Sequence, residues 1–287
     1  MSASTSPRAI ETPLPRSITG SDVTPVRVNS RPEARSTTWL GVLPPLLLLI
    51  LMETAARFEW IPRHLLPAPS DLLVTLSQLG QEVVMQHVVA SSLRVAIGFA
   101  IGASLALVIG AAVGLFRPLE DLLDPSFQAL RAIPSLAWVP LLLLWLGIDE
   151  APKIVLIALG AFFPVYLGVS SGLRDVDRKL VEVARMAGLS QAALARRVLL
   201  PAAMPPIMTG IRNGLSLAWM FMVAAELIAA TKGLGYLLTD GRETGRADLV
   251  LSAIVLLAVL GKLSDSAVRW WEQRVLHWRD TFESRAA

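Results

Sequence analysis

Residues 98–114 read GFAIGASLALVIGAAVG, contain no charged side chain and lie within a longer apolar run, 87–115. A helix needs about 20 apolar residues to cross the roughly 30 Å of hydrocarbon in a bilayer. The run is long enough, and it lacks the period-2 alternation of a half-buried strand. Its glycines form two pairs with a spacing of four, Gly98 with Gly102 and Gly110 with Gly114. This spacing lets helix backbones approach closely, so the stretch predicts a membrane helix packed against a neighbour within the same chain.

Five further runs are long and apolar enough to span: 39–57, 127–147, 152–172, 207–230 and 249–268. The composition agrees, because 54% of the 287 residues are hydrophobic and only 17% are charged. If both termini are cytoplasmic, 16 of the 26 Lys and Arg residues lie on that side, six lie opposite and four lie within spans. This excess favours that orientation. The sequence therefore predicts an all-α membrane protein with six transmembrane helices and cytoplasmic N- and C-termini.

The remaining segments divide the chain further. Residues 1–36 are rich in Ser, Thr, Pro and Arg without an apolar run, which predicts a disordered cytoplasmic tail. Residues 37–86 hold the first span, with Trp39 at an interface, and an outer amphipathic helix. Ser70 is the expected cap of that helix, and one face carries Leu72, Leu76, Leu79 and Val83. Residues 87–272 form a five-helix core, and 273–287 form a cytoplasmic C-terminal tail.

Chemistry within the chain is not expected. There is no cysteine, and the three histidines, His64, His87 and His277, lack the spacing of metal ligands. No stretch fits the G-x-x-x-x-G-K-[ST] pattern of a phosphate-binding loop, so any ATP must bind to a partner. The pair Gly233 and Gly235 indicates a turn on the outer side. We therefore expect no catalytic residues, no metal, no nucleic-acid partner and no cofactor in this chain.

Charged residues within spans are costly and must face protein, water or a headgroup region. Three arginines lie near span ends and are expected to extend toward the headgroups: Arg94, Arg131 and Arg212. Lys262 and Asp265 are three residues apart and could pair with each other. Glu226 lies deeper, where it either pairs with an arginine or lines a pathway. Arg94 is the candidate for attracting an anionic solute.

The largest loop on the predicted cytoplasmic side, residues 173–206, contains EVARMAGLSQAALARRVLLP at 182–201. Asp177 can cap a first helix, Gly188 fits the left-handed position after it, and Ser190 can cap a second helix. Three prolines are expected to end this second helix: Pro201, Pro205 and Pro206. The result is a helix–glycine–helix unit, which we call the elbow. Its alanines offer a small-residue surface to a partner: Ala184, Ala187, Ala192, Ala193 and Ala195.

The spacing within the elbow resembles the EAA loop of ABC importer permeases. The matching positions are Glu182, Ala184, Gly188, Val198, Leu200 and Pro201, with Val183 in place of the first Ala and Val198 in place of Ile. The resemblance extends over about 60–275 and includes LPAPSDLL (66–73), LRAIPSLAWVPLLLLWLGIDEAPKI (130–154), AEL (225–227) and GLGYL (233–237). These stretches are similar to the nitrate/sulfonate/taurine branch of the family, and most of all to its aliphatic sulfonate permeases.

The resemblance implies a type I ABC importer permease in the bacterial inner membrane. In such a system two permease chains, here most simply two copies of this chain, form the pore within membrane lipid. Two ABC ATPase subunits bind ATP and Mg²⁺, and a periplasmic or lipid-anchored binding protein delivers the substrate. The elbow would then be the coupling helix on which the ATPase acts. Aliphatic sulfonates are the expected substrates, with taurine, nitrate or another small anion as alternatives.

Two other classes of protein predict different sequence features. A secondary transporter would show an inverted repeat and ionisable residues near the membrane midplane. The sequence has no evident repeat. A structural membrane scaffold would not require the spacing found in the elbow.

Overall fold

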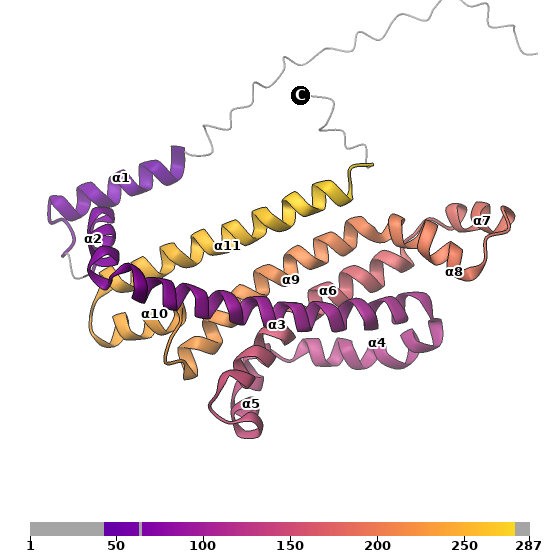
Figure 1. The fold of residues 1–287 in the computed structure, drawn as a ribbon, viewed down its shortest axis with the longest axis horizontal. Helices are drawn as coiled ribbons and strands as arrows, with labels where there is room; N and C mark the ends of the chain where they lie inside the picture. Colours follow the sequence, from indigo (N-terminus) through magenta and orange to yellow (C-terminus); the bar gives the residue numbers. More distant parts are fainter. Residues whose placement is uncertain (1–42, 63–64, 279–287) are drawn as a thin grey trace, which may run out of the picture.

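The computed structural model describes residues 43–62 and 65–278, and this part of the chain is folded into helices without strands (Figure 1). A 3₁₀ turn, Ser135–Trp138, precedes α5, and a π-helical segment, Ala195–Leu199, precedes α9. The α-helices are α1 (Leu43–Arg57), α2 (Pro69–Leu79), α3 (Gln81–Leu115), α4 (Arg117–Ala132), α5 (Val139–Leu146), α6 (Glu150–Arg174), α7 (Arg178–Met186), α8 (Gln191–Leu194), α9 (Leu200–Ala229), α10 (Leu234–Glu243) and α11 (Ala247–Val275). The predicted all-α class is confirmed.

Four helical stretches are long and apolar enough to cross a membrane: α3, α6, the continuous stretch Gln191–Ile228 that ends in α9, and α11. They correspond to four of the six predicted spans. The predicted span 127–147 is wrong as one straight helix, because α4 and the segment 135–146 meet at 88°. Pro134 explains the break, since its ring drives the preceding Ile133 into the extended conformation (ψ 122°). Of the first predicted span, α1 supplies only 15 residues, and Trp39 lies outside the described residues.

The core forms around α6, which packs between α3 and α9. A Cβ atom at Gly98 would lie 2.6 Å from the side chain of Ile157, and one at Gly102 would overlap the backbone of Ala158. The second glycine pair meets α6 in the same way, through Val169 and Leu173. The predicted close packing of residues 98–114 within the chain is therefore confirmed, and its partner is α6.

The crossing of α6 and α9 brings two backbones together. A Cβ atom at Gly168 would lie 2.9 Å from Cα of Gly210, and one at Gly210 would lie 2.8 Å from the carbonyl oxygen of Pro164. Apolar side chains complete the contact, including Val165 and Met208, which are almost fully buried. We did not single out these glycines in the sequence, although they follow the same small-residue logic as residues 98–114.

The helix α2 leans on α11, where Thr75 donates a hydrogen bond to Asp248 (2.7 Å). Its predicted face is present, since the leucines expected on it are half-buried: Leu72, Leu76 and Leu79. Ser70 does not cap this helix, because the helix already begins at Pro69. The Ser70 hydroxyl instead donates to the Glu53 carboxylate (2.9 Å) and ties α2 to α1. Val83 lies beyond the turn at Gly80 and belongs to α3.

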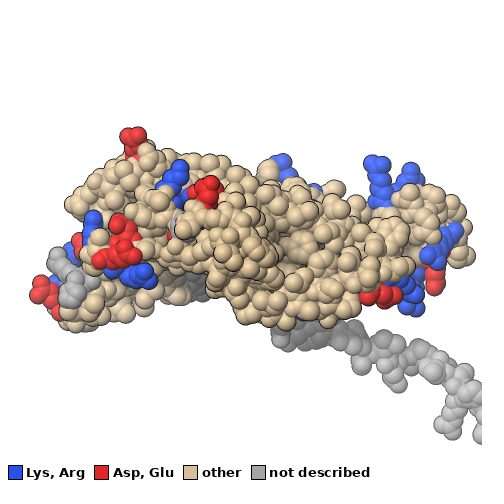
Figure 2. Space-filling view, turned by 90° about the horizontal axis from the view of Figure 1, so that it is seen from below, with Lys and Arg blue, Asp and Glu red and all other residues tan. Residues whose placement is uncertain are grey.

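The long helices give the molecule two distinct ends (Figure 1). The elbow end holds α7, α8, the end of α6 and the end of α11, while the α10 end holds α10 and the first turns of α3 and α6. On the face shown in Figure 2, most charged side chains gather toward these two ends, and the surface between them is largely uncharged. The helix α3 also exposes apolar side chains such as Leu105 and Val108, which suit contact with lipid.

Candidate functional site

The elbow turns at Gly188, after helix α7. The Asp177 side chain accepts a hydrogen bond from the Lys179 N–H (2.9 Å) at the start of α7, which confirms the predicted cap. At the other end Gly188 has φ +75°, its N–H donates to the Arg185 carbonyl (2.9 Å), and the Leu189 N–H donates to the Ala184 carbonyl (3.2 Å). This pair of bonds is a Schellman motif, which requires a left-handed residue. The predicted role of Gly188 in ending α7 is confirmed.

Beyond this turn the chain runs into α9 without a break. The Ser190 hydroxyl accepts from the Ala193 N–H (3.4 Å), so the second predicted cap is also confirmed. The prolines do not end this helix as we expected. Pro201 directly follows the π-helical segment Ala195–Leu199 near the start of α9, and Pro205 and Pro206 lie inside the helix. Gly172 on α6 leaves the space that the Pro206 ring occupies, which helps to keep the helix intact.

The sequence motif of the elbow is only partly on its surface. Three of its residues are exposed, Glu182, Gly188 and Leu200, while Val198 and Pro201 are half-buried. Ala184 is 6% exposed and packs inward, so it does not belong to the expected alanine surface. The buried Leu194 of α8 packs inward in the same way.

The exposed side of α7 carries apolar side chains among its charged ones. It carries Leu180, Val183 and Met186, of which Met186 is 88% exposed. We call these three residues the α7 patch. Their spacing of three residues is visible in the sequence, but we had predicted a contact surface made of the alanines. Exposed apolar side chains of this size, set among arginines, mark a surface for contact with another protein or a membrane.

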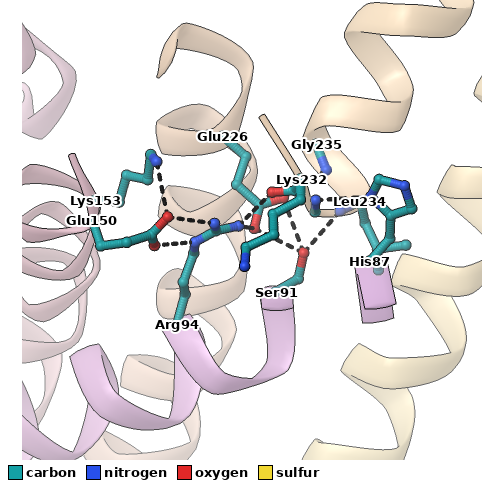
Figure 3. A network of polar contacts seen from close by, with 10 residues as sticks. His87, Ser91, Arg94, Glu150, Lys153, Glu226, Lys232, Leu234 and Gly235 are labelled. Atoms are coloured by element: carbon teal, nitrogen blue, oxygen red, sulfur yellow. Dashed lines mark hydrogen bonds and ion pairs between the residues drawn. The ribbon is translucent and has the colours of Figure 1, made fainter. Parts of the chain in front are cut away.

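A second site lies at the α10 end and is built on Arg94 (Figure 3). Arg94 is 4% exposed, and its guanidinium binds Glu150 through two hydrogen bonds, Nε to Oε2 (2.6 Å) and Nη2 to Oε1 (2.7 Å). Its Nη1 donates to the Glu226 carboxylate (2.7 Å) and to the backbone carbonyl of Lys232 (2.7 Å). Arg94 thus joins α3, α6 and α9, and the expectation that it extends toward the headgroups is wrong.

Glu226 is fully enclosed at the start of α10 (Figure 3). Its carboxylate accepts hydrogen bonds from the Ser91 hydroxyl (2.8 Å) and from the Gly235 N–H (2.8 Å) in addition to Arg94. The first turn of a helix favours a negative charge, so α10 and Arg94 stabilise the same carboxylate. A Cβ atom at Gly233 would overlap this carboxylate, so this position needs glycine. The predicted turn at Gly233 and Gly235 is therefore also a carboxylate cradle.

Further polar groups complete this site. The Gly233 N–H donates to Nδ1 of His87 (2.9 Å), and the Leu234 N–H donates to the Ser91 hydroxyl (2.8 Å). Lys153, which is also buried, donates to Glu150 (3.2 Å). We call this cluster the Arg94 network. One face of α3 carries three polar residues at spacings of four and three: His87, Ser91 and Arg94. This spacing predicts a polar cluster that our sequence analysis missed.

Of the two roles considered for Glu226, the structure contains the pair with an arginine. Arg94 binds both Glu226 and Glu150, so its guanidinium is poorly suited to attract an anionic solute. Removing Arg94 would leave the buried Glu226 without its counter-charge. The network is therefore a joint between helices.

Two further ion-pair clusters lie toward the elbow end. On α9, Arg212 pairs with Asp265 (3.3 Å) and Glu272 (3.4 Å) of α11. The predicted pair of Lys262 with Asp265 is wrong, because Asp265 binds Arg212 and Arg269 instead. On α6, Arg174 pairs with Glu120 (2.6 Å) and Asp124 (3.4 Å) of α4. No group of three His, Cys, Asp or Glu residues suited to a metal ion occurs within residues 43–62 and 65–278.

A groove of about 870 Å³ runs along α6 and α9. We call it the α6–α9 groove. Its polar side chains are Arg131, Ser135, Ser171, Thr209, Asn213 and Ser216, and its apolar walls include Leu159, Phe163, Leu167, Leu217, Met220 and Phe221. Its volume falls within the range of roughly 300–1,000 Å³ common for small-molecule sites.

Comparison with known proteins identifies the family. Residues 98–277 match the model of the binding-protein-dependent transport system inner membrane component. A putative aliphatic sulfonates transport permease of Bacillus subtilis (strain 168) is 40% identical, over 89% of this chain and 94% of that protein. A protein of the same description from Escherichia coli (strain K12) is 43% identical, over 85% and 93%. The taurine transport system permease of E. coli is 34% identical, over 80% and 86%.

A solved structure agrees with this fold. A chain of the MetNI methionine ABC transporter, in an inward-facing conformation, superposes with a TM-score of 0.60 at 21% identity, over 68% of this chain and 97% of that one. The family match covers more than half of the chain, and the two sulfonate permeases match over most of it. The chain therefore belongs to the family of inner-membrane components of binding-protein-dependent transport systems.

Proposed function

We propose that this chain is the pore-forming subunit of an ATP-driven importer and receives the motion of an ABC ATPase through the elbow. The observation that carries the proposal is the elbow itself. It holds a glycine-ended helix with an exposed apolar patch at one end of the long helices, in a chain of a transport family. The motif residues Glu182 and Gly188 lie on its surface, where a partner could reach them.

The ATPase would contact the α7 patch. An apolar side chain such as Met186 fits a groove on a partner, and the arginines beside it offer charge for pairing. ATP and Mg²⁺ bind to the ATPase in this scheme, and this chain holds no cofactor and catalyses no reaction. Closure of two ATPase subunits would then move the elbow and switch the pore between inward- and outward-facing states.

Aliphatic sulfonates are the proposed substrates. The support comes from two permeases described for these compounds, which are 40% and 43% identical to this chain. A periplasmic or lipid-anchored binding protein would deliver the sulfonate to the pore. Taurine, itself a sulfonate, is the second candidate, since a taurine permease is 34% identical.

In the membrane, the chain would have six spans with both termini in the bacterial cytoplasm. The excess of Lys and Arg on the side of the elbow supports this orientation. The uncharged surface of α3 and its neighbours would face lipid. A second copy of the chain would complete the pore. The segments 1–36 and 273–287 would be cytoplasmic tails, and 37–86 would stand beside the core, 87–272.

Uptake measurements test this proposal. Cells that lack the chain, but contain the ATPase and binding protein, are compared with cells that also contain the chain. Labelled butanesulfonate, taurine and nitrate are supplied separately. We expect butanesulfonate uptake only with the chain present. Uptake of nitrate alone would overturn the sulfonate proposal, and failure of the chain to assemble with an ATPase would overturn the role of the elbow.

A further inference from the structure

The arginines of the helical bundle differ in what they face. Arg94, Arg174 and Arg212 each pair with two carboxylates. Arg131, on the last turn of α4, is exposed, and within the described ranges no carboxylate lies within ion-pair distance of it. A charged residue at membrane depth is costly unless it faces water or a binding partner. Arg131 therefore differs from the other three arginines, because no carboxylate among the described residues compensates its charge.

Arg131 lies far along α4 from the elbow end of the molecule. It follows the first residue of α4, at the elbow end, by 14 residues, or about 21 Å of helix. The α6 residues that share its cavities, Phe163 and Leu167, precede the end of α6 at Arg174 by 11 and 7 residues, or about 16 and 10 Å. Figure 1 shows α4 reaching from the elbow end toward the middle of the molecule.

The α6–α9 groove, which Arg131 lines, has a cationic character. No Asp or Glu is among the described residues that line it. Three of its hydroxyl groups already donate to carbonyls of their own helices: Ser171 to Leu167, Thr209 to Pro205 and Ser216 to Arg212. Arg131, Asn213 and Ser135 remain as the groups whose N–H or O–H donors face the groove.

A smaller cavity of about 230 Å³ adjoins the groove and leads toward Arg174. Both cavities are lined by Arg131, Phe163, Leu167 and Ser171. Asp124 also lines the smaller one, but its carboxylate accepts from Tyr166 (2.9 Å) and Gln128 (2.8 Å) and pairs with Arg174 (3.4 Å). The carboxylate of Asp124 is thus engaged, and Arg131 lies where the two cavities meet.

We infer that Arg131 binds the sulfonate headgroup of the substrate in the α6–α9 groove, with Asn213 and Ser135 as further donors and the apolar walls against the alkyl chain. A guanidinium offers paired N–H groups that match two oxygens of an oxyanion. Phe163, Leu217 and Met220 supply the surface that an alkyl chain requires. This inference rests on the proposed transport of sulfonates and assigns the recognition of the anion to a residue of the pore.

Transport of hexane-1-sulfonate tests the inference in proteoliposomes that contain the chain with its ATPase and binding protein. We compare R131Q, which removes the charge, with R131K, which keeps it. Arg117 is a matched control, because it is an exposed arginine of the same helix that does not line the groove. Loss of a charged hydrogen-bonded contact predicts at least about tenfold slower uptake for R131Q. R131K should lose less, and R117Q should keep the unmodified rate.

Cysteine protection gives a readout that a structural role of Arg131 would not change. The chain has no cysteine, so N213C introduces a single thiol in the groove. We expect hexanesulfonate to slow the reaction of this thiol with N-ethylmaleimide when Arg131 is present, but not in N213C/R131Q. A thiol at R117C should react at the same rate with and without the sulfonate.

The outcomes separate this inference from the proposed function. Absence of hexanesulfonate uptake by the unmodified, ATP-hydrolysing complex would overturn the sulfonate assignment. Uptake that R131Q leaves unchanged, or protection of N213C that persists in R131Q, would overturn the anion site and leave the transport proposal intact. If R131Q fails to assemble, R131K decides: near-normal uptake with protected N213C supports the site, and unprotected N213C contradicts it.

Discussion

At the α10 end, Arg94 and Glu226 are buried, hydrogen-bonded to each other and held by three helices. At the elbow end, most side chains of α7 are exposed and the chain turns on a single left-handed glycine. The first arrangement resists motion, because separating Arg94 from Glu226 leaves a fully buried carboxylate without its counter-charge. The second offers an apolar surface to a partner and connects it directly to α9. The comparison fits the proposed contact of an ATPase at the elbow end, with the α10 end as the place where the helices keep their relative positions.

Loss of the buried charge at the α10 end should have the largest effect. In R94M, Glu226 keeps its place beside α10 but loses its counter-charge, so we expect a loss of stability of about 3–5 kcal/mol. Thermal unfolding of the purified chain in detergent measures it. The exposed Arg185 of α7 is the control, and R185M should unfold at nearly the unmodified temperature.

The double variant R94M/E226L sharpens this prediction. It removes both charges of the buried pair and should recover part of the stability lost in R94M, because Glu150 is partly exposed and can be solvated. Equal unfolding temperatures for R94M and the unmodified chain would contradict the description of this end as a joint.

The turn of the elbow comes next in expected effect. Val at position 188 would have to adopt a positive φ, at a cost of about 1–3 kcal/mol, although its side chain would meet no neighbour. We expect G188V to retain ATP hydrolysis by the complex and to lose most uptake. G188N should keep more activity, because Asn tolerates the left-handed region.

Gly245 provides the matched control for this variant. It has φ +67°, is equally open and lies in the turn between α10 and α11 at the other end. G245V should therefore lose similar stability but keep uptake coupled to ATP hydrolysis. Equal loss of coupling in the two variants would show that strain alone, and not the elbow, explains the result.

The sequence predicted the local features of both ends and missed the distant contacts. Gly188, Asp177 and Ser190 were predicted correctly because caps and left-handed turns depend on neighbours within a few residues. The pairing of Arg94 with Glu226 joins residues 132 positions apart, and no periodicity carries that information. Only the face of α3 that bears Arg94 was visible in the spacing of its polar residues.

Length and hydropathy also hid two features of the backbone. The run 127–147 is apolar throughout most of its length, but Pro134 divides it into helices that meet at 88°. Conversely, Pro205 and Pro206 predicted the end of a helix, but α9 continues past both prolines. Its packing on α6 stabilises the helix there. Hydropathy alone predicts neither the break at Pro134 nor the continuation of α9.

A smaller effect is expected from the α7 patch. Replacing Met186 by Asp places a charge where an apolar contact with the ATPase is proposed, and should weaken assembly by about 1–2 kcal/mol, or roughly 5- to 30-fold. Co-purification at graded concentrations of the ATPase measures this. M186L retains the apolar surface and should assemble normally, so equal assembly of both variants would place the contact elsewhere.

The smallest effect is expected from the N-terminal segment 1–36, which lies outside the described residues. Deletion of residues 1–30, with a new start codon, should leave insertion and uptake unchanged, because neither end of the bundle depends on it in this account. Uptake per inserted chain in membrane vesicles checks this expectation. Loss of uptake with normal insertion would assign a further role to this segment.

Uptake by purified components tests the central claim most directly. Labelled butanesulfonate is offered, with the binding protein, to proteoliposomes that contain either this chain alone or this chain with the ATPase, in the presence of ATP or of an ion gradient only. The account predicts accumulation with the ATPase and ATP, and none by the chain alone. Accumulation by the chain alone, driven by an ion gradient, would contradict it and identify a secondary transporter.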